Sequence, residues 1–100
     1  MFRELHKVAL ERLCDRILAE ARIQVDDLSK SPHERYVNLY QLIQNRNKDV
    51  TRAFDDFRRS TAVMQIGIIH KMGLFTKEEL KRFSPETLEI VAIYAPIPDA

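Results

Sequence analysis

The first quarter of the chain carries the hydrophobic pattern of one amphipathic helix. Apolar side chains recur every three or four residues, with charged side chains on the opposite face. No glycine or proline interrupts the pattern before residue 32. The spacing therefore predicts a helix over residues 3–28, about 40 Å long at about 1.5 Å per residue. Its apolar stripe consists of Phe2, Leu5, Ala9, Leu13, Ile17, Ala21, Val25 and Leu28, widened by Leu10, Cys14 and Leu18.

A second long helix is predicted to begin after Ser31. The segment Ser31-Pro32-His33-Glu34 has a serine N-cap, a proline at the first helical position and a glutamate three residues after the cap. Beyond it, residues repeat at alternating spacings of four and three, which is typical of a coiled-coil seam. Gly73 is the expected terminator of this helix. The seam consists of Tyr36, Tyr40, Ile43, Asn47, Val50, Phe54, Phe57, Thr61, Met64 and Ile68.

Two short helices are predicted after Gly73. Thr76 and Glu79 repeat the capping-box pattern, and Ser84-Pro85 begins the last helix. The prolines at 96 and 98 predict an extended tail over residues 96–100. The chain is thus predicted to be a single all-α domain over residues 1–95, followed by this tail.

The length of the second helix leaves two possibilities. A continuous helix over residues 32–72 would be about 60 Å long, whereas a compact domain of this size is roughly 35 Å across. Because the heptad phase continues without a slip, we favour the continuous helix, in an elongated chain whose seam is covered by another chain. The alternative is a break near Asn47, where the segment 45–51 contains five weak helix formers.

The expected architecture is an antiparallel hairpin of two long helices with two short helices across its far end, assembled as a dimeric helical bundle. The dimer is inferred because the apolar helix surface exceeds what one hairpin readily covers. Around Gly67 the helix is apolar on nearly every side, and the glycine would let the first helix or a second subunit approach closely. The predicted interface consists of Tyr40, Ile43, Asn47, Val50, Phe54, Phe57, Met64 and Ile68.

Composition and charge argue against several classes of protein. With 16 Lys+Arg and 15 Asp+Glu the net charge is +1, which argues against a strongly basic nucleic-acid domain. Cys14 is the only cysteine, so no internal disulfide can form. The N-terminus does not have the pattern of a signal peptide, and no apolar run is long enough to span a bilayer. We therefore expect a cytoplasmic protein that is not associated with a membrane.

No arrangement of reactive side chains predicts an enzyme, a metal site or a cofactor site. His6, His33 and His70 are too far apart for the ligand spacing of a helical metal site. His6 is also two turns away from Cys14, so it is not placed to activate that thiol. The sequence contains no glycine-rich phosphate loop. These observations favour a small non-enzymatic interaction or regulatory protein, acting through a homodimeric or partner-binding helix surface.

Two other functions remain open. A nucleic-acid-associated regulator would use a basic stretch of the second helix, although Asp55 and Asp56 lie among its arginines and cancel most of their field. A small-molecule binder would need a cavity within the bundle. The basic stretch consists of Arg46, Lys48, Arg52, Arg58 and Arg59.

Overall fold

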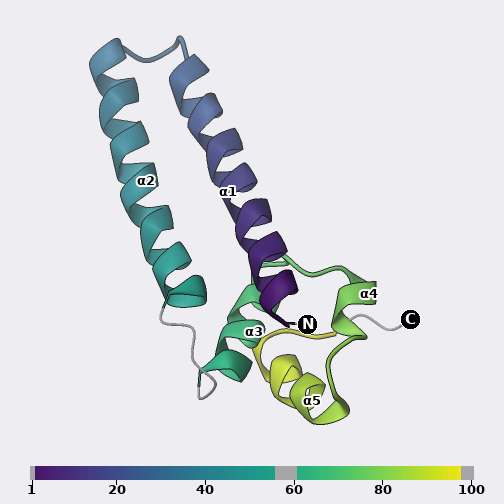
Figure 1. Ribbon diagram of the computed structural model, residues 1–100. Helices are drawn as coiled ribbons and strands as arrows, with labels where there is room; N and C mark the ends of the chain where they lie inside the picture. The colour runs from purple at the N-terminus through teal and green to yellow at the C-terminus, as the bar shows by residue number, and fades with distance from the viewer. Residues whose placement is uncertain (1, 56–60, 98–100) are drawn as a thin grey trace.

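The computed structural model describes residues 2–55 and 61–97 of the chain. In Figure 1, the two long helices lie side by side as an antiparallel hairpin, and the shorter helices gather at its open end, near the N-terminus. Within the described residues, the all-α class and the packing of two long helices are confirmed, and no strand is present. The five helices are α1 (Phe2–Asp26), α2 (Pro32–Phe54), α3 (Ala62–Lys71), α4 (Lys77–Leu80) and α5 (Pro85–Tyr94).

The predicted capping box begins α2. The Ser31 hydroxyl accepts a hydrogen bond from the backbone N–H of Glu34 at 3.1 Å. In return, the Glu34 carboxylate accepts a hydrogen bond from the Ser31 N–H at 3.3 Å. Two donors that lack partners within the helix are thereby satisfied, which confirms the predicted start of the second helix.

The boundaries of the shorter helices also follow local sequence. Thr76 and Glu79 form a second reciprocal capping box at the start of α4. Ser84 accepts a hydrogen bond from the N–H of Thr87 at 3.2 Å and begins α5. Gly73 follows α3 with a φ of 73°, a left-handed conformation that glycine adopts without a steric penalty.

The second long helix ends at Phe54, so neither expectation about its length is correct. Asp55 has an extended backbone (φ −78°, ψ 158°), and the continuous helix over residues 32–72 is wrong. A break near Asn47 is wrong as well, because α2 runs through that segment without interruption. The side chain of Gln65 on α3 donates a hydrogen bond of 2.8 Å to the Asp55 carbonyl, which satisfies the backbone at this turn. Phe57 and the rest of the link 56–60 lie outside the described residues.

Two clusters of buried apolar side chains form the core, and both lie at the base of the hairpin. Along α1 these clusters reach from Leu5 to Ile17, and along α2 they begin at Val50. The distal half of the hairpin projects beyond them, which gives the molecule extents of 51 × 30 × 22 Å. Its radius of gyration is 16.1 Å, compared with about 13 Å for a compact domain of 100 residues. The buried residues are Ala9, Leu13, Ala53, Phe54, Ile69 and Leu74 in one cluster and Leu5, Ile66, Leu80, Phe83 and Val91 in the other.

Two arginines of α1 attach the base to the hairpin. Arg12 donates hydrogen bonds to both carboxylate oxygens of Glu79, at 2.6 and 3.0 Å. Arg16 donates to the carbonyl oxygens of Met72 and Gly73, at 2.6 and 2.9 Å, just beyond the end of α3. A cation in this position also interacts favourably with the helix dipole. The hydrogen bonds from Arg12 lower the pKa of Glu79 below its ordinary value of 4.5.

Gly67 allows a close approach within the chain, by α5. A Cβ atom at residue 67 would overlap the Cδ1 atom of the Tyr94 ring, far inside van der Waals contact. The small residue that the sequence singles out therefore accommodates an aromatic side chain of α5. The close approach at Gly67 is made by α5, so neither the first helix nor a second subunit is needed to explain why this residue is small.

Ser31→Ala should destabilise the protein by about 1 kcal/mol, because it removes the hydroxyl that caps α2. The free energy of unfolding from urea denaturation measures this loss. A variant with unchanged stability would show that the cap contributes nothing to the native state.

Gly67→Ala should destabilise the protein by about 1–3 kcal/mol, because the new methyl group overlaps the Tyr94 ring. The same substitution in a Tyr94→Leu background should cost much less, since the rigid ring is no longer there. Urea denaturation of the four proteins tests this. An equal cost in both backgrounds would contradict the contact.

Glu79→Gln should make the protein less sensitive to acid. Because the pKa of Glu79 is lowered in the folded state, its ion pair stabilises the native state above about pH 4.5. That contribution is lost as the pH falls through the lowered pKa. Between about pH 5 and pH 3, the free energy of unfolding of the wild type should therefore fall more steeply than that of the variant. Arg12→Met should flatten the profile in the same way, and parallel profiles for all three proteins would contradict the assignment.

Candidate functional site

The two long helices contact one another along a seam that differs from the predicted one. Five positions of α1 with Asp27 directly after it, and six positions of α2, are spaced alternately by three and four residues and are partly or fully buried. On α2 each of these positions lies one residue before the predicted seam. The seam consists of Leu10, Leu13, Ile17, Glu20 and Gln24 on α1, Asp27 directly after α1, and Arg35, Leu39, Leu42, Arg46, Asp49 and Ala53 on α2.

The distal part of this seam is held by charged groups. Arg46 donates two hydrogen bonds to the Glu20 carboxylate, at 3.0 and 2.9 Å, and a third to Asp49 at 3.3 Å. The hydrogen bonds from Arg46 lower the pKa of Glu20, and the same contacts raise the pKa of Arg46. Closer to the tip, Arg35 donates to the Val25 carbonyl at 2.7 Å. The bidentate pair between Glu20 and Arg46 fixes the register of the two helices, that is, which residues of α1 and α2 lie opposite each other.

One side of the hairpin presents a continuous apolar surface. In two antiparallel helices, the residues that directly follow seam positions project to the same side of the pair. Six of them in the distal half are large and apolar, and we call this set the hairpin face. It consists of Leu18 and Val25 on α1, Leu28 in the turn after α1, and Tyr36, Tyr40 and Ile43 on α2.

The C-terminal helices leave the hairpin face uncovered. Arg12 and Arg16, which bind the turn after α3 and helix α4, directly precede the seam positions Leu13 and Ile17. Residues in that position project to the opposite side of the hairpin. In addition, the distal half extends beyond α3, α4 and α5 (Figure 1). None of the elements in the described part of the chain therefore covers the hairpin face.

The hairpin face is about as large as the largest apolar patches that ordinary monomers expose. Its six side chains are between 42% and 83% exposed. With about 200 Å² for the full surface of a large apolar side chain, these fractions amount to about 700 Å². The largest apolar patch of a typical monomer is about 300–600 Å². The hairpin face includes no charged residue, and the Tyr40 hydroxyl accepts a hydrogen bond from Gln44 at 2.9 Å. Such a surface fits contact with another protein.

The structure separates the predicted interface residues into two groups. Tyr40 and Ile43 lie on the hairpin face, and Asn47 is exposed at its edge. The other described members belong to the base, and Phe57 lies outside the described residues. Of those in the base, Phe54 is buried in the core, Val50 and Ile68 pack against it, and Met64 is exposed on α3.

Four members of the hairpin face were not predicted as interface residues. The sequence analysis assigned Leu18, Val25 and Leu28 to the stripe of the first helix, and Tyr36 to the seam of the second. The available signal was the width of the apolar stripe on the first helix. A stripe that is wider than one packing seam indicates a second contact surface.

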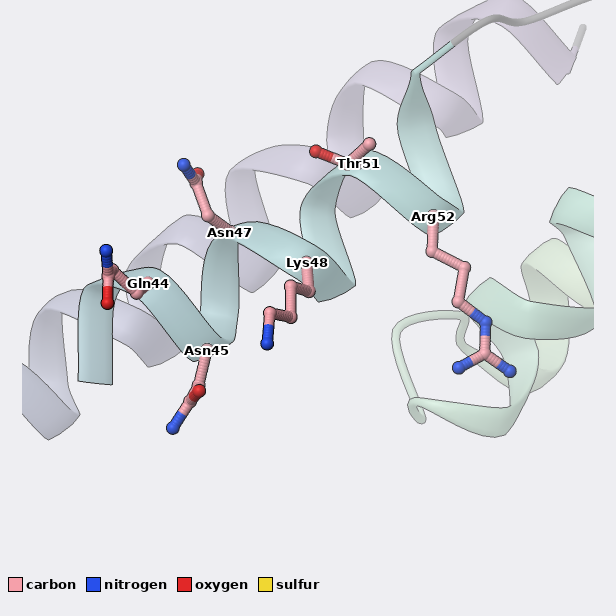
Figure 2. Close-up of a pocket in the computed structure, with 6 residues that line it drawn as sticks. All are labelled: Gln44, Asn45, Asn47, Lys48, Thr51 and Arg52. Carbon is pink, nitrogen blue, oxygen red and sulfur yellow. The ribbon is translucent and has the colours of Figure 1, made fainter. Parts of the chain in front are cut away.

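The basic stretch does not converge into a nucleic-acid site among the described residues. Arg46 is bound to Glu20 and Asp49, while Lys48 and Arg52 are exposed. Figure 2 shows these last two side chains in a shallow surface pocket together with Gln44, Asn45, Asn47 and Thr51, all from α2. Because the described lining residues all come from one helix, no second described element faces a ligand bound there. Arg58 and Arg59 lie outside the described residues.

The described histidines and cysteine are not gathered into a metal site. Within residues 2–55 and 61–97, no three His, Cys, Asp or Glu side chains lie close enough together to hold a metal ion. His70 is buried, and its Nε2 atom lies 3.1 Å from the carbonyl oxygens of both Ala95 and Pro96. This histidine therefore anchors the chain that leaves α5. Cys14 is half-buried with a free thiol.

Among the described helices, none combines the length and the apolar character needed to cross a membrane.

Comparisons with protein-family models, with curated proteins and with solved structures find no match to this chain.

Proposed function

We propose that this chain is a small non-enzymatic interaction protein that forms a homodimer through its hairpin face. The observation that carries the proposal is the hairpin face itself, an uncovered apolar surface of about 700 Å² on a projecting pair of helices. Dimerisation would remove this surface from water, and burial of apolar surface is the main favourable term in most protein association.

A second copy of the chain suits this surface for two reasons. Each partner in a standard protein interface contributes about 800 Å², and the hairpin face supplies close to that area. In a two-fold dimer the same patch meets itself, so a charged patch would bring like charges together. The hairpin face has no charged member, so two copies can meet without bringing like charges together.

Tyr40→Glu should convert the dimer into a monomer, because it places a carboxylate at the centre of the apolar contact. Light scattering coupled to size-exclusion chromatography measures the mass. The wild type should show twice the chain mass of 11.7 kDa, and the variant a single chain mass. Circular dichroism should report the same helix content for both, since Tyr40 is exposed within the chain.

The matched control is Gln41→Glu, which adds the same charge at the adjacent exposed residue, outside the hairpin face. This variant should remain dimeric. A wild type with the mass of one chain at about 100 μM would overturn the proposal, as would a dimer that survives Tyr40→Glu.

A further inference from the structure

We infer that the two hairpins of the dimer lie with both tips at the same end, so that α1 of one chain packs against α2 of its partner. This inference rests on the proposed dimer. Two hairpins can meet face to face about a two-fold axis that runs either along the hairpin or across it. The first arrangement places α1 opposite the partner's α2. The second places α1 opposite the partner's α1, and the tips then point in opposite directions.

The sizes of the side chains on the two helices distinguish these arrangements. The register set by Glu20 and Arg46 places Val25 level with Tyr40, and Ala21 level with Ile43. Across the whole face, α1 contributes small or aliphatic side chains, whereas both aromatic rings come from α2. The hairpin face is therefore shallow along one helix and prominent along the other.

With the tips at the same end, large residues meet small ones. The partner's Tyr40 then packs near Val25, and the partner's Ile43 packs near Ala21, at an even spacing between the two layers. With the tips at opposite ends, α2, which carries both aromatic rings, faces the partner's α2, and α1 faces the partner's α1. The layers would be held apart along α2 and would leave a gap along α1, which forfeits contact.

The charged rim of α1 favours the same arrangement. Arg22 is exposed and directly follows Ala21, which lies between Leu18 and Val25 along α1. With the tips at the same end, Arg22 lies level with Gln44 of the partner subunit, a neutral hydrogen-bonding side chain. With the tips at opposite ends, Arg22 lies near the axis and faces its own copy, which is repulsive.

Distances between spin labels test this arrangement. Each label is attached to a single cysteine, Lys7→Cys or Lys30→Cys, in a Cys14→Ala background whose dimeric mass is checked first by light scattering. Lys7 is exposed near the start of α1, and Lys30 is exposed at the tip. With the tips at the same end, both labels should give distances below about 30 Å, because diagonal helices of a four-helix bundle are close together. With the tips at opposite ends, the Lys7 labels should be about 50 Å apart, since about 16 residues of helix separate each from the axis.

The Lys30 label separates failure of this inference from failure of the proposed dimer. It gives a short distance in both dimeric arrangements, because the tip lies close to the axis in either case. A short Lys30 distance with a Lys7 distance near 50 Å would overturn the arrangement and leave the dimer intact. Absence of dipolar coupling at both positions, with the mass of one chain, would overturn the dimer and this inference together.

Discussion

The apolar contacts at the base determine how α1 and α2 are rotated about their own axes. This rotation decides which side chains each surface of the hairpin presents. At the base, Leu13 and Ala53 are buried in one cluster with residues of α3 and the turn that follows it. Because a helix is rigid, this rotation continues along α2 for four more turns. The positions that then face α1 are Leu42, Leu39 and two arginines, while Tyr36 and Tyr40 are turned to the side. The exposed aromatic side chains of the tip are thus a consequence of packing at the opposite end of the helix.

The two halves of the molecule are stabilised in different ways. The base buries its apolar residues in two clusters, and the two arginines of α1 join it to the hairpin through carboxylate and carbonyl partners. The distal half depends on the ion pair between Glu20 and Arg46, whose side chains are 38% and 37% exposed. Solvent-exposed ion pairs contribute little to stability, about 0–1 kcal/mol. The tip is therefore the less stable part of the fold, and it has the most to gain from a partner that removes its apolar surface from water.

Covering the hairpin face would also change the electrostatics of the seam beneath it. A second hairpin packed on this side lowers the local dielectric constant around the ion pair between Glu20 and Arg46 and strengthens the attraction between them. The pair is hydrogen-bonded at both carboxylate oxygens, so burial leaves neither oxygen without a partner. In the proposed dimer, the apolar contact and the ion pair thus stabilise each other.

The sequence by itself determined the features that depend on neighbouring residues. Ser31, Thr76 and Ser84 begin their helices, and Gly73 follows α3, because a cap or a left-handed turn is decided within about four residues. The uncovered apolar surface was also foreseeable, since the pattern contains more apolar positions than one hairpin can bury. Two of the three hairpin-face residues of α2, Tyr40 and Ile43, are among the interface residues that periodicity predicted.

Tertiary structure decided the end of α2 and the choice of seam. The turn at Asp55 has no strong local signal, and the side chain that satisfies its carbonyl, Gln65, comes from the next helix. Two seams offset by one residue have the same heptad spacing along α2, and hydropathy favours the one that contains the tyrosines. In the distal half, the contact of Arg46 with Glu20 selects the other. Periodicity defines the spacing of a stripe, but only the partners of a helix determine which of two neighbouring stripes is buried.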